Sequence, residues 1–124
     1  MTDTPLLSLD ARYYTDEKIF REEQQGLLAR TWQFAGHASQ LEQTGDYFTF
    51  EIAGESLFCI RDDNNELKCF YNVCQHRAHE LLPAGSGNVK SVIVCPYHAW
   101  AFEREGQLRG APRSQTRQRA GRRT

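Results

Sequence analysis

Two short pairs of metal-binding residues place the strongest constraint on the fold of this chain. Cys74 and His76 are separated by one residue, and Cys95 and His98 are separated by two. Eighteen residues lie between the two pairs. Each pair supplies one thiolate and one imidazole, so a fold that uses all four side chains must bring two separate loops together.

Two thiolates and two imidazoles form the ligand set of a Rieske-type [2Fe-2S] cluster, in which two His replace two Cys on one iron. In this interpretation Cys74 and Cys95 hold one iron, and His76 and His98 hold the other. Replacing two thiolates by neutral imidazoles removes negative charge from the cluster. The reduction potential therefore rises to roughly −150 to +300 mV, from about −400 mV for an all-Cys plant-type cluster. The four residues therefore predict a carrier of single electrons.

Other uses of the same residues stay open at this point. A structural zinc site also takes two Cys and two His, but its usual spacing places the Cys together and then the His. Here the two residue types alternate along the chain. A disulfide between Cys74 and Cys95 would leave both His unexplained.

The segments around these ligands resemble a known family. N-V-C-Q-H-R-A-H-E-L-L (72–82) and C-P-Y-H-A-W-A-F (95–102) are similar to the Rieske domain of the alpha subunits of ring-hydroxylating, non-haem iron oxygenases. Within that family the similarity is greatest to the branch that acts on quaternary ammonium compounds such as carnitine or glycine betaine. The segments 31–41 and 45–50 extend the resemblance, which covers about residues 10–112.

The resemblance implies a function in electron transfer. In the family, a reductase or ferredoxin reduces the cluster, which passes electrons to a mononuclear Fe(II) held by two His and one carboxylate in a catalytic domain. We expect this chain to be the N-terminal part of such an alpha subunit, without the catalytic domain, and to be inactive alone, so no catalytic residue is assigned. A stand-alone Rieske ferredoxin and a zinc-stabilised interaction module are the alternatives.

Composition limits the remaining possibilities. With 124 residues, 40% hydrophobic and 25% charged, the chain is expected to form one globular domain. No apolar run approaches the roughly 20 residues of a membrane helix, and no signal peptide is recognisable, so we expect a cytoplasmic protein without a membrane partner. Four Cys, two of them assigned to the cluster, do not indicate a secreted disulfide scaffold.

The chain divides into three predicted segments: a flexible leader (1–10), a Rieske domain with an N-terminal helix (11–111) and a disordered Arg-rich tail (112–124). The last twelve residues contain five Arg and no acid, against a net charge of −1 for the whole chain. We expect the tail to mark a truncation or frameshift rather than an arm that binds nucleic acid, since it lacks aromatic residues for stacking on bases.

The hydrophobic pattern predicts an all-β fold, a small sandwich or barrel, preceded by a short helix. Thr15 is the expected N-cap of a helix that reaches about Ala29, and Trp32 with Phe34 suggests a first strand. Further strands are expected at 48–52, 57–61, 67–73, 89–94, 99–102 and near Leu108.

Two further cysteines, Cys59 and Cys69, lie on predicted strands. They are interpreted as small core residues, because free Cys is among the most buried residue types. A disulfide between them is the alternative.

The other His and the aromatic residues near the ligands have simpler interpretations. His37 is expected to be structural, and His79 to be a solvated loop residue rather than a third imidazole ligand. Tyr97 and Trp100 flank His98 and are expected to shield the cluster from water.

Overall fold

The computed structural model describes residues 7–112. Within that range, residues 7–33 with 52–54 form one compact unit, and residues 34–51 with 55–112 form a second. The predicted disordered tail lies, except for its first residue, outside the described residues, and so does most of the predicted leader.

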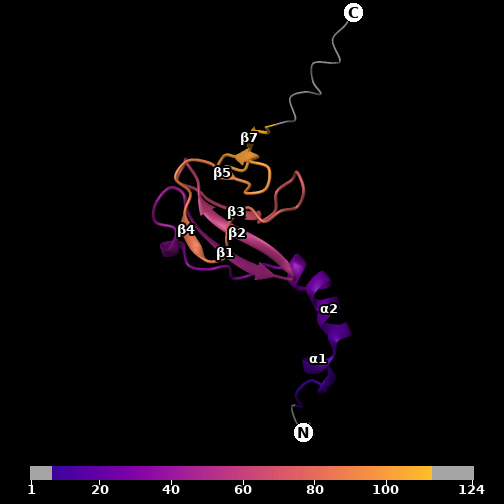
Figure 1. The fold of residues 1–124 in the computed structure, drawn as a ribbon. Coiled ribbons are helices and arrows are strands. Elements are labelled where there is room, and N and C mark those ends of the chain that lie inside the picture. Colours follow the sequence, from indigo (N-terminus) through magenta and orange to yellow (C-terminus); the bar gives the residue numbers. More distant parts are fainter. Residues whose placement is uncertain (1–6, 113–124) are drawn as a thin grey trace, which may run out of the picture. The chain divides into compact units, whose positions relative to one another are not determined.

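The first unit is helical. Asp16, not the predicted Thr15, is the N-cap of the main helix, and its carboxylate accepts from the backbone N–H groups of Lys18 and Ile19. The predicted helix ends earlier than expected and continues as a 3-10 turn. None of the helices within residues 7–112 is long and apolar enough to cross a membrane. The elements are α1 (Arg12–Thr15), α2 (Glu17–Gly26) and η1 (Leu28–Arg30) (Figure 1).

The strand predicted at Trp32 and Phe34 is wrong. Trp32 is fully exposed and Phe34 is 86% exposed, and the backbone at these positions is not part of a strand. Alternation of two aromatic residues predicts a strand only when one face is buried against a partner.

The second unit is built on a four-stranded sheet with the strand order β3-β2-β1-β4. Its first three strands match the prediction, while β4 was not expected, because a Ser-Gly-Asn sequence has low β-propensity. Close contact explains the Gly in this strand: a Cβ on Gly87 would lie 3.0 Å from the ring of Tyr47, its partner on β1. The strands are β1 (Asp46–Ile52), β2 (Glu55–Arg61), β3 (Leu67–Tyr71) and β4 (Ser86–Asn88) (Figure 1).

A smaller sheet with the order β5-β6-β7 completes this unit. The strand predicted at 89–94 is shorter than expected, since only its last two residues pair. Both pairings in this sheet are antiparallel, with a register shift at Ala101 and Phe102. The strands are β5 (Ile93–Val94), β6 (Ala101–Phe102) and β7 (Leu108–Gly110).

One hydrophobic core joins the two sheets and confirms the predicted all-β class. Phe58 and Ile60 on β2 pack in the same buried cluster as Ile93 on β5 and Phe102 on β6. Burial of such side chains stabilises the fold by about 1.5–3 kcal/mol each. The other members of this hydrophobic core are Tyr47, Cys74, Leu82, Val89 and Cys95.

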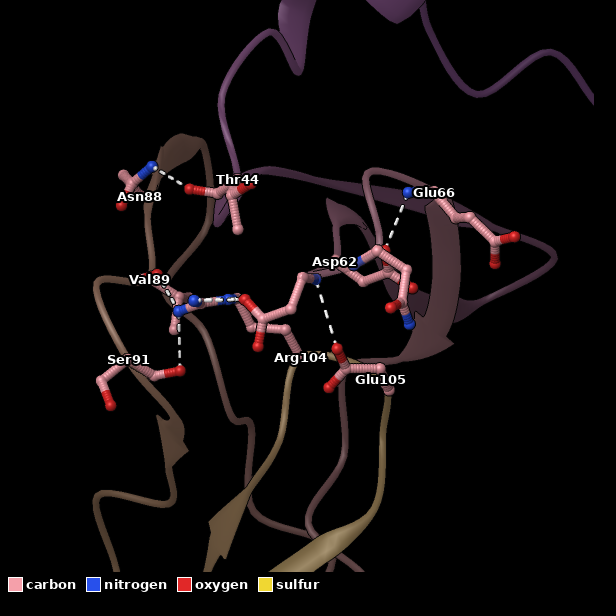
Figure 2. Close-up of polar contacts among 10 residues, drawn as sticks. Thr44, Asp62, Glu66, Asn88, Val89, Ser91, Arg104 and Glu105 are labelled. Carbon is pink, nitrogen blue, oxygen red and sulfur yellow. Dashed lines mark hydrogen bonds and ion pairs between the residues drawn. The ribbon is translucent and has the colours of Figure 1, made fainter.

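A polar network also links the two sheets (Figure 2). Arg104, beyond β6, donates to the carbonyl oxygens of Val89 (3.0 Å) and Ser91 (2.7 Å), and its Nε donates to the carboxylate of Asp63 (2.9 Å). Glu105 accepts from the backbone N–H of Asp63 at 3.2 Å. Arg104 therefore fixes the segment that enters β5 and the second predicted ligand loop.

Candidate metal centre

The first ligand loop follows β3 and is closed by two backbone hydrogen bonds. The N–H of Cys74 donates to the carbonyl oxygen of His79 (2.7 Å), and the N–H of Ala78 donates to that of Cys74 (2.8 Å). Ala78 has φ of 52°, in the left-handed region that L-residues rarely adopt. The turn presents His76 on the exposed side of the loop.

The second ligand loop, between β5 and β6, repeats this frame. The N–H of Cys95 donates to the carbonyl oxygen of Trp100 (2.8 Å), and the N–H of Ala99 donates to that of Cys95 (3.0 Å). Ala99 has φ of 58°. The donors and acceptors stand at the same offsets from the Cys in both loops, but the His comes one residue later in the second.

The two thiols meet inside the core. Cys74 is 1% exposed and Cys95 is 2% exposed, and the Cys74 thiol donates a hydrogen bond to the Cys95 sulfur. In each loop the backbone N–H groups two and three residues after the Cys also donate to its sulfur. These amides stabilise negative charge on sulfur, as a thiolate ligand requires.

Burial raises the pKa of the Cys74 thiol above its ordinary value. Burial opposes ionisation of Cys95 too, but there the backbone amides and the Cys74 thiol prevail and lower its pKa.

The two imidazoles also meet. The ring centroids of His76 and His98 lie 4.6 Å apart, with the planes at 76°. Trp100 stacks on His76 at 4.7 Å, and Tyr97 contacts the His98 ring at 3.9 Å. Aromatic cover over the two predicted ligands is thus present, although Tyr97 itself stays exposed.

The site is therefore composed of a thiol pair and an imidazole pair. Within residues 7–112, no three His, Cys, Asp or Glu side chains converge as a single-ion site would need. A [2Fe-2S] cluster of the Rieske type takes two thiolates on one iron and two imidazoles on the other. Like ligands held in pairs, with amide donors at the sulfurs, fit that group.

Sequence reasoning missed two supports of this site. Asn72, 3% exposed, accepts from the N–H groups of Leu81 (3.2 Å) and Leu82 (2.9 Å) and donates to the Leu82 carbonyl oxygen (2.8 Å). It thereby fastens both ends of the first ligand loop. The left-handed backbone conformation of Ala78 and Ala99 was also missed, although an Ala four residues after each of Cys74 and Cys95 is a signal visible in the sequence.

The two remaining histidines, His37 and His79, are not members of the two Cys–His pairs. His37 is structural: its Nδ1 accepts from the backbone N–H of Ser39 (3.2 Å) at the start of η2 (Ala38–Gln40). His79 is exposed and stacks on Tyr97 at 5.6 Å.

The core interpretation of the remaining cysteines is wrong for Cys69, which is exposed, while Cys59 is half-buried. The two are direct cross-strand partners on β2 and β3. They occupy outward positions on strands whose alternate side chains, such as Phe58 and Ile60, fill the core, so residue type alone did not predict their burial.

Comparisons with known proteins agree with this geometry. Residues 31–119 match the family described as Rieske [2Fe-2S] domain. The chain is 46% identical over 101 residues to the carnitine monooxygenase oxygenase subunit of Escherichia coli K12, covering 82% of this chain and 27% of that protein. It is 36% identical over 104 residues to the biphenyl 2,3-dioxygenase alpha subunit of Rhodococcus jostii RHA1, covering 84% and 22%.

Solved structures show the same likeness. The apo form of the quaternary ammonium Rieske monooxygenase CntA superposes with a TM-score of 0.83 at 41% identity, over 88% of this chain and 32% of that one. A naphthalene 1,2-dioxygenase gives 0.82 at 32% identity, over 90% and 25%. This chain thus spans about a quarter of the length of the curated relatives it matches.

Proposed function

Because the chain belongs to the Rieske [2Fe-2S] domain family, we propose that it is the electron-transfer domain of an oxygenase alpha subunit. The observation that carries the proposal is the meeting of two thiols and two imidazoles on loops with the same hydrogen-bonded frame. A bound cluster supplies transfer of one electron at a time.

We assign Cys74 and Cys95 as ligands of one iron, and His76 and His98 as ligands of the other. The contact between the buried thiols supports the first assignment. The 4.6 Å separation of the two rings supports the second. Imidazole is a suitable ligand for iron, and thiolate is the soft anionic ligand that iron–sulfur clusters use.

The rest of the site sets the surroundings of these ligands. Backbone N–H groups directed at both sulfurs stabilise their negative charge, and burial excludes water from them. Trp100 covers one face of the His76 ring. Because His76 is exposed, it would give an electron partner access to a bound cluster.

The partners follow from the relatives. We propose a reductase or ferredoxin as electron donor and a mononuclear Fe(II) in a catalytic domain as acceptor. Identity of 46% to a carnitine monooxygenase subunit, against 36% to a biphenyl dioxygenase subunit, favours a quaternary ammonium substrate. The cytoplasm is the proposed compartment, because its reducing thiols keep cysteines such as these four available.

Anaerobic reconstitution with iron and sulfide tests the proposal. We expect equal amounts of iron and acid-labile sulfide, two of each per chain, and on reduction the electron-spin resonance signal of a mixed-valence [2Fe-2S] pair. Replacement of His76 by Cys serves as a comparison, since an added thiolate should lower the reduction potential. Zinc bound without sulfide would contradict the proposal.

A further inference from the structure

Cys59 and Cys69 form a second thiol pair, hereafter the cross-strand pair, on the β2–β3 hairpin. The hydrogen bonds that bracket the hairpin define its register. The N–H of Asp62 donates to the carbonyl oxygen of Glu66 (2.9 Å), and the N–H of Asn72 donates to that of Ser56 (2.8 Å). Since hydrogen-bonded and non-hydrogen-bonded pairs alternate along antiparallel strands, Cys59 and Cys69 form a non-hydrogen-bonded pair.

The non-hydrogen-bonded position of Cys59 and Cys69 determines how close their backbones lie. In a non-hydrogen-bonded pair the Cα atoms lie about 4.5 Å apart, and the side chains are closer than in the other kind of pair. A disulfide needs a Cα separation of roughly 4.4–6.8 Å. The two backbones therefore already stand within the range that a disulfide bridges.

The chemistry of the two thiols is unequal. The half-buried Cys59 thiol donates a hydrogen bond to the sulfur of the exposed Cys69. That bond lowers the pKa of Cys69 to about 7, and the same bond, with burial, raises the pKa of Cys59. At neutral pH, Cys69 is thus a partly ionised and accessible nucleophile, and Cys59 is a protonated thiol held against it.

We propose that Cys59 and Cys69 are a redox modification site, which a low-molecular-weight disulfide oxidises reversibly to an intramolecular disulfide. The Cys69 thiolate attacks one sulfur of the small disulfide, breaks its S–S bond and releases one small thiolate. The Cys59 thiol then loses its proton to solvent and attacks the Cys69 sulfur, and the second small thiolate leaves. Two protein thiols are oxidised by two electrons, and one small disulfide is reduced to two thiols.

This site is separate from the proposed cluster site. The ligand thiols Cys74 and Cys95 are buried, whereas Cys69 faces solvent, so a small disulfide reaches the cross-strand pair first. Oxidation of the pair is a two-electron event on the face of the sheet away from the core. Failure of this proposal would leave cluster binding untouched, and the reverse also holds.

The test uses the full chain, both with a reconstituted cluster and without one, in a series of glutathione redox buffers. Samples are alkylated, digested with trypsin and mapped by mass spectrometry. Cleavage after Arg30, Arg61, Lys68 and Arg77 places Cys59 in the peptide 31–61 and Cys69, together with Cys74, in the peptide 69–77, so fragment ions of that peptide identify which of its two Cys is linked. We expect these peptides to become linked through Cys59 and Cys69, to separate on reduction, and to do so while the visible spectrum of the cluster is unchanged.

Single variants separate the two steps. Cys59→Ser should stop at a mixed disulfide of Cys69 with one glutathione, and Cys69→Ser should leave Cys59 mainly alkylated. Both variants should keep the wild-type cluster spectrum, which verifies their folding. Two free thiols across the whole redox series in cluster-loaded protein would overturn the proposal, and so would a link that forms only after the cluster is lost.

Discussion

The two thiol pairs of this protein have similar proximity and different surroundings. In both, one Cys donates a hydrogen bond to the sulfur of the other. At Cys74 and Cys95, backbone amides also point at each sulfur, the pair is buried, and an imidazole follows within three residues. At Cys59 and Cys69, the thiols stand on extended strands, and the partner thiol and burial cause their pKa shifts.

The comparison teaches that closeness of two sulfurs does not decide what they do. Extended strands direct their N–H groups into the ladder or away from it, so a strand offers few donors to a sulfur on its face. A loop that curls around its own Cys turns several amides toward the sulfur and stabilises a thiolate. Cys74 and Cys95, hereafter the loop pair, therefore suit a metal cluster, while the cross-strand pair suits disulfide exchange.

The largest expected effect is loss of the cluster from the loop pair. Cys74→Ser or Cys95→Ser should abolish assembly, because a hydroxyl is a poor ligand for iron at neutral pH. Iron and acid-labile sulfide after reconstitution measure the loss. Cys59→Ser and Cys69→Ser are the matched controls and should retain both. Wild-type iron and sulfide in either loop variant would show that the ligand assignment is wrong.

The next effect concerns Asn72, which lies in the chain between Cys69 and Cys74. Asn72→Ala removes the partners of two buried backbone groups of Leu82 and of the part-buried N–H of Leu81, so we expect a loss of about 2–3 kcal/mol in the free energy of unfolding. Urea denaturation of the cluster-free chain measures this loss. The exposed Asn64→Ala is the control, with a change within about 0.5 kcal/mol. Equal midpoints for the two variants would mean that Asn72 does not support the loop.

The pH dependence of the alkylation rate distinguishes the cross-strand pair from ordinary cysteines. Because the pKa of Cys69 is lowered to about 7, its thiolate is half-formed near that pH and its alkylation rate should rise through the same range. Cys59→Ala removes the hydrogen bond, so the pKa should rise toward about 8.5 and the rate at neutral pH should fall about tenfold. Peptide-resolved alkylation of the cluster-loaded protein gives both profiles. Coincident profiles would contradict the role of Cys59.

The smallest effect tests whether the two ligand loops are alike. Ala78→Gly and Ala99→Gly should each stabilise the cluster-free chain by about 1 kcal/mol, because only Gly adopts positive φ without strain. Thermal unfolding measures the change. Ala84→Gly, in an exposed segment without positive φ, should instead destabilise slightly or have no effect. A gain in one loop and a loss in the other would break the equivalence of the loops.

Much of this structure was predictable from local chemistry. The alternation of Phe48, Phe50 and Ile52 predicted β1, and the turn residues Asp62–Asn65 separated β2 from β3 as expected. The types and spacing of the Cys and His residues predicted a common site, and the structure brings the two thiols together and the two imidazoles together, while their role as ligands stays a prediction. These features depend on residues within a few positions of one another, which a single sequence displays directly.

The remainder depended on contacts between distant segments. β4 is a strand because it pairs with Tyr47 and its neighbours on β1, and the sequence Ser-Gly-Asn does not by itself predict that pairing. The role of Asn72 depends on Leu81 and Leu82, which reach it only after the loop has folded back. Cys69 is exposed because of which face of β3 meets the core, a property of the sheet rather than of the residue.

The pairing of β1 with β4 also has a consequence for the time at which the site can assemble. Asp46 is paired with Asn88, so this ladder closes a long stretch of chain that contains the first ligand loop, and the second loop follows directly. Long-range strand pairing is slow because its loop-closure entropy must be overcome before contacts form. We therefore expect the β2–β3 hairpin, with its short connection, to form early in folding, and the ligand thiols to meet only in the late, rate-limiting stage. A nascent chain would then be open to thiol oxidation before it is able to accept iron.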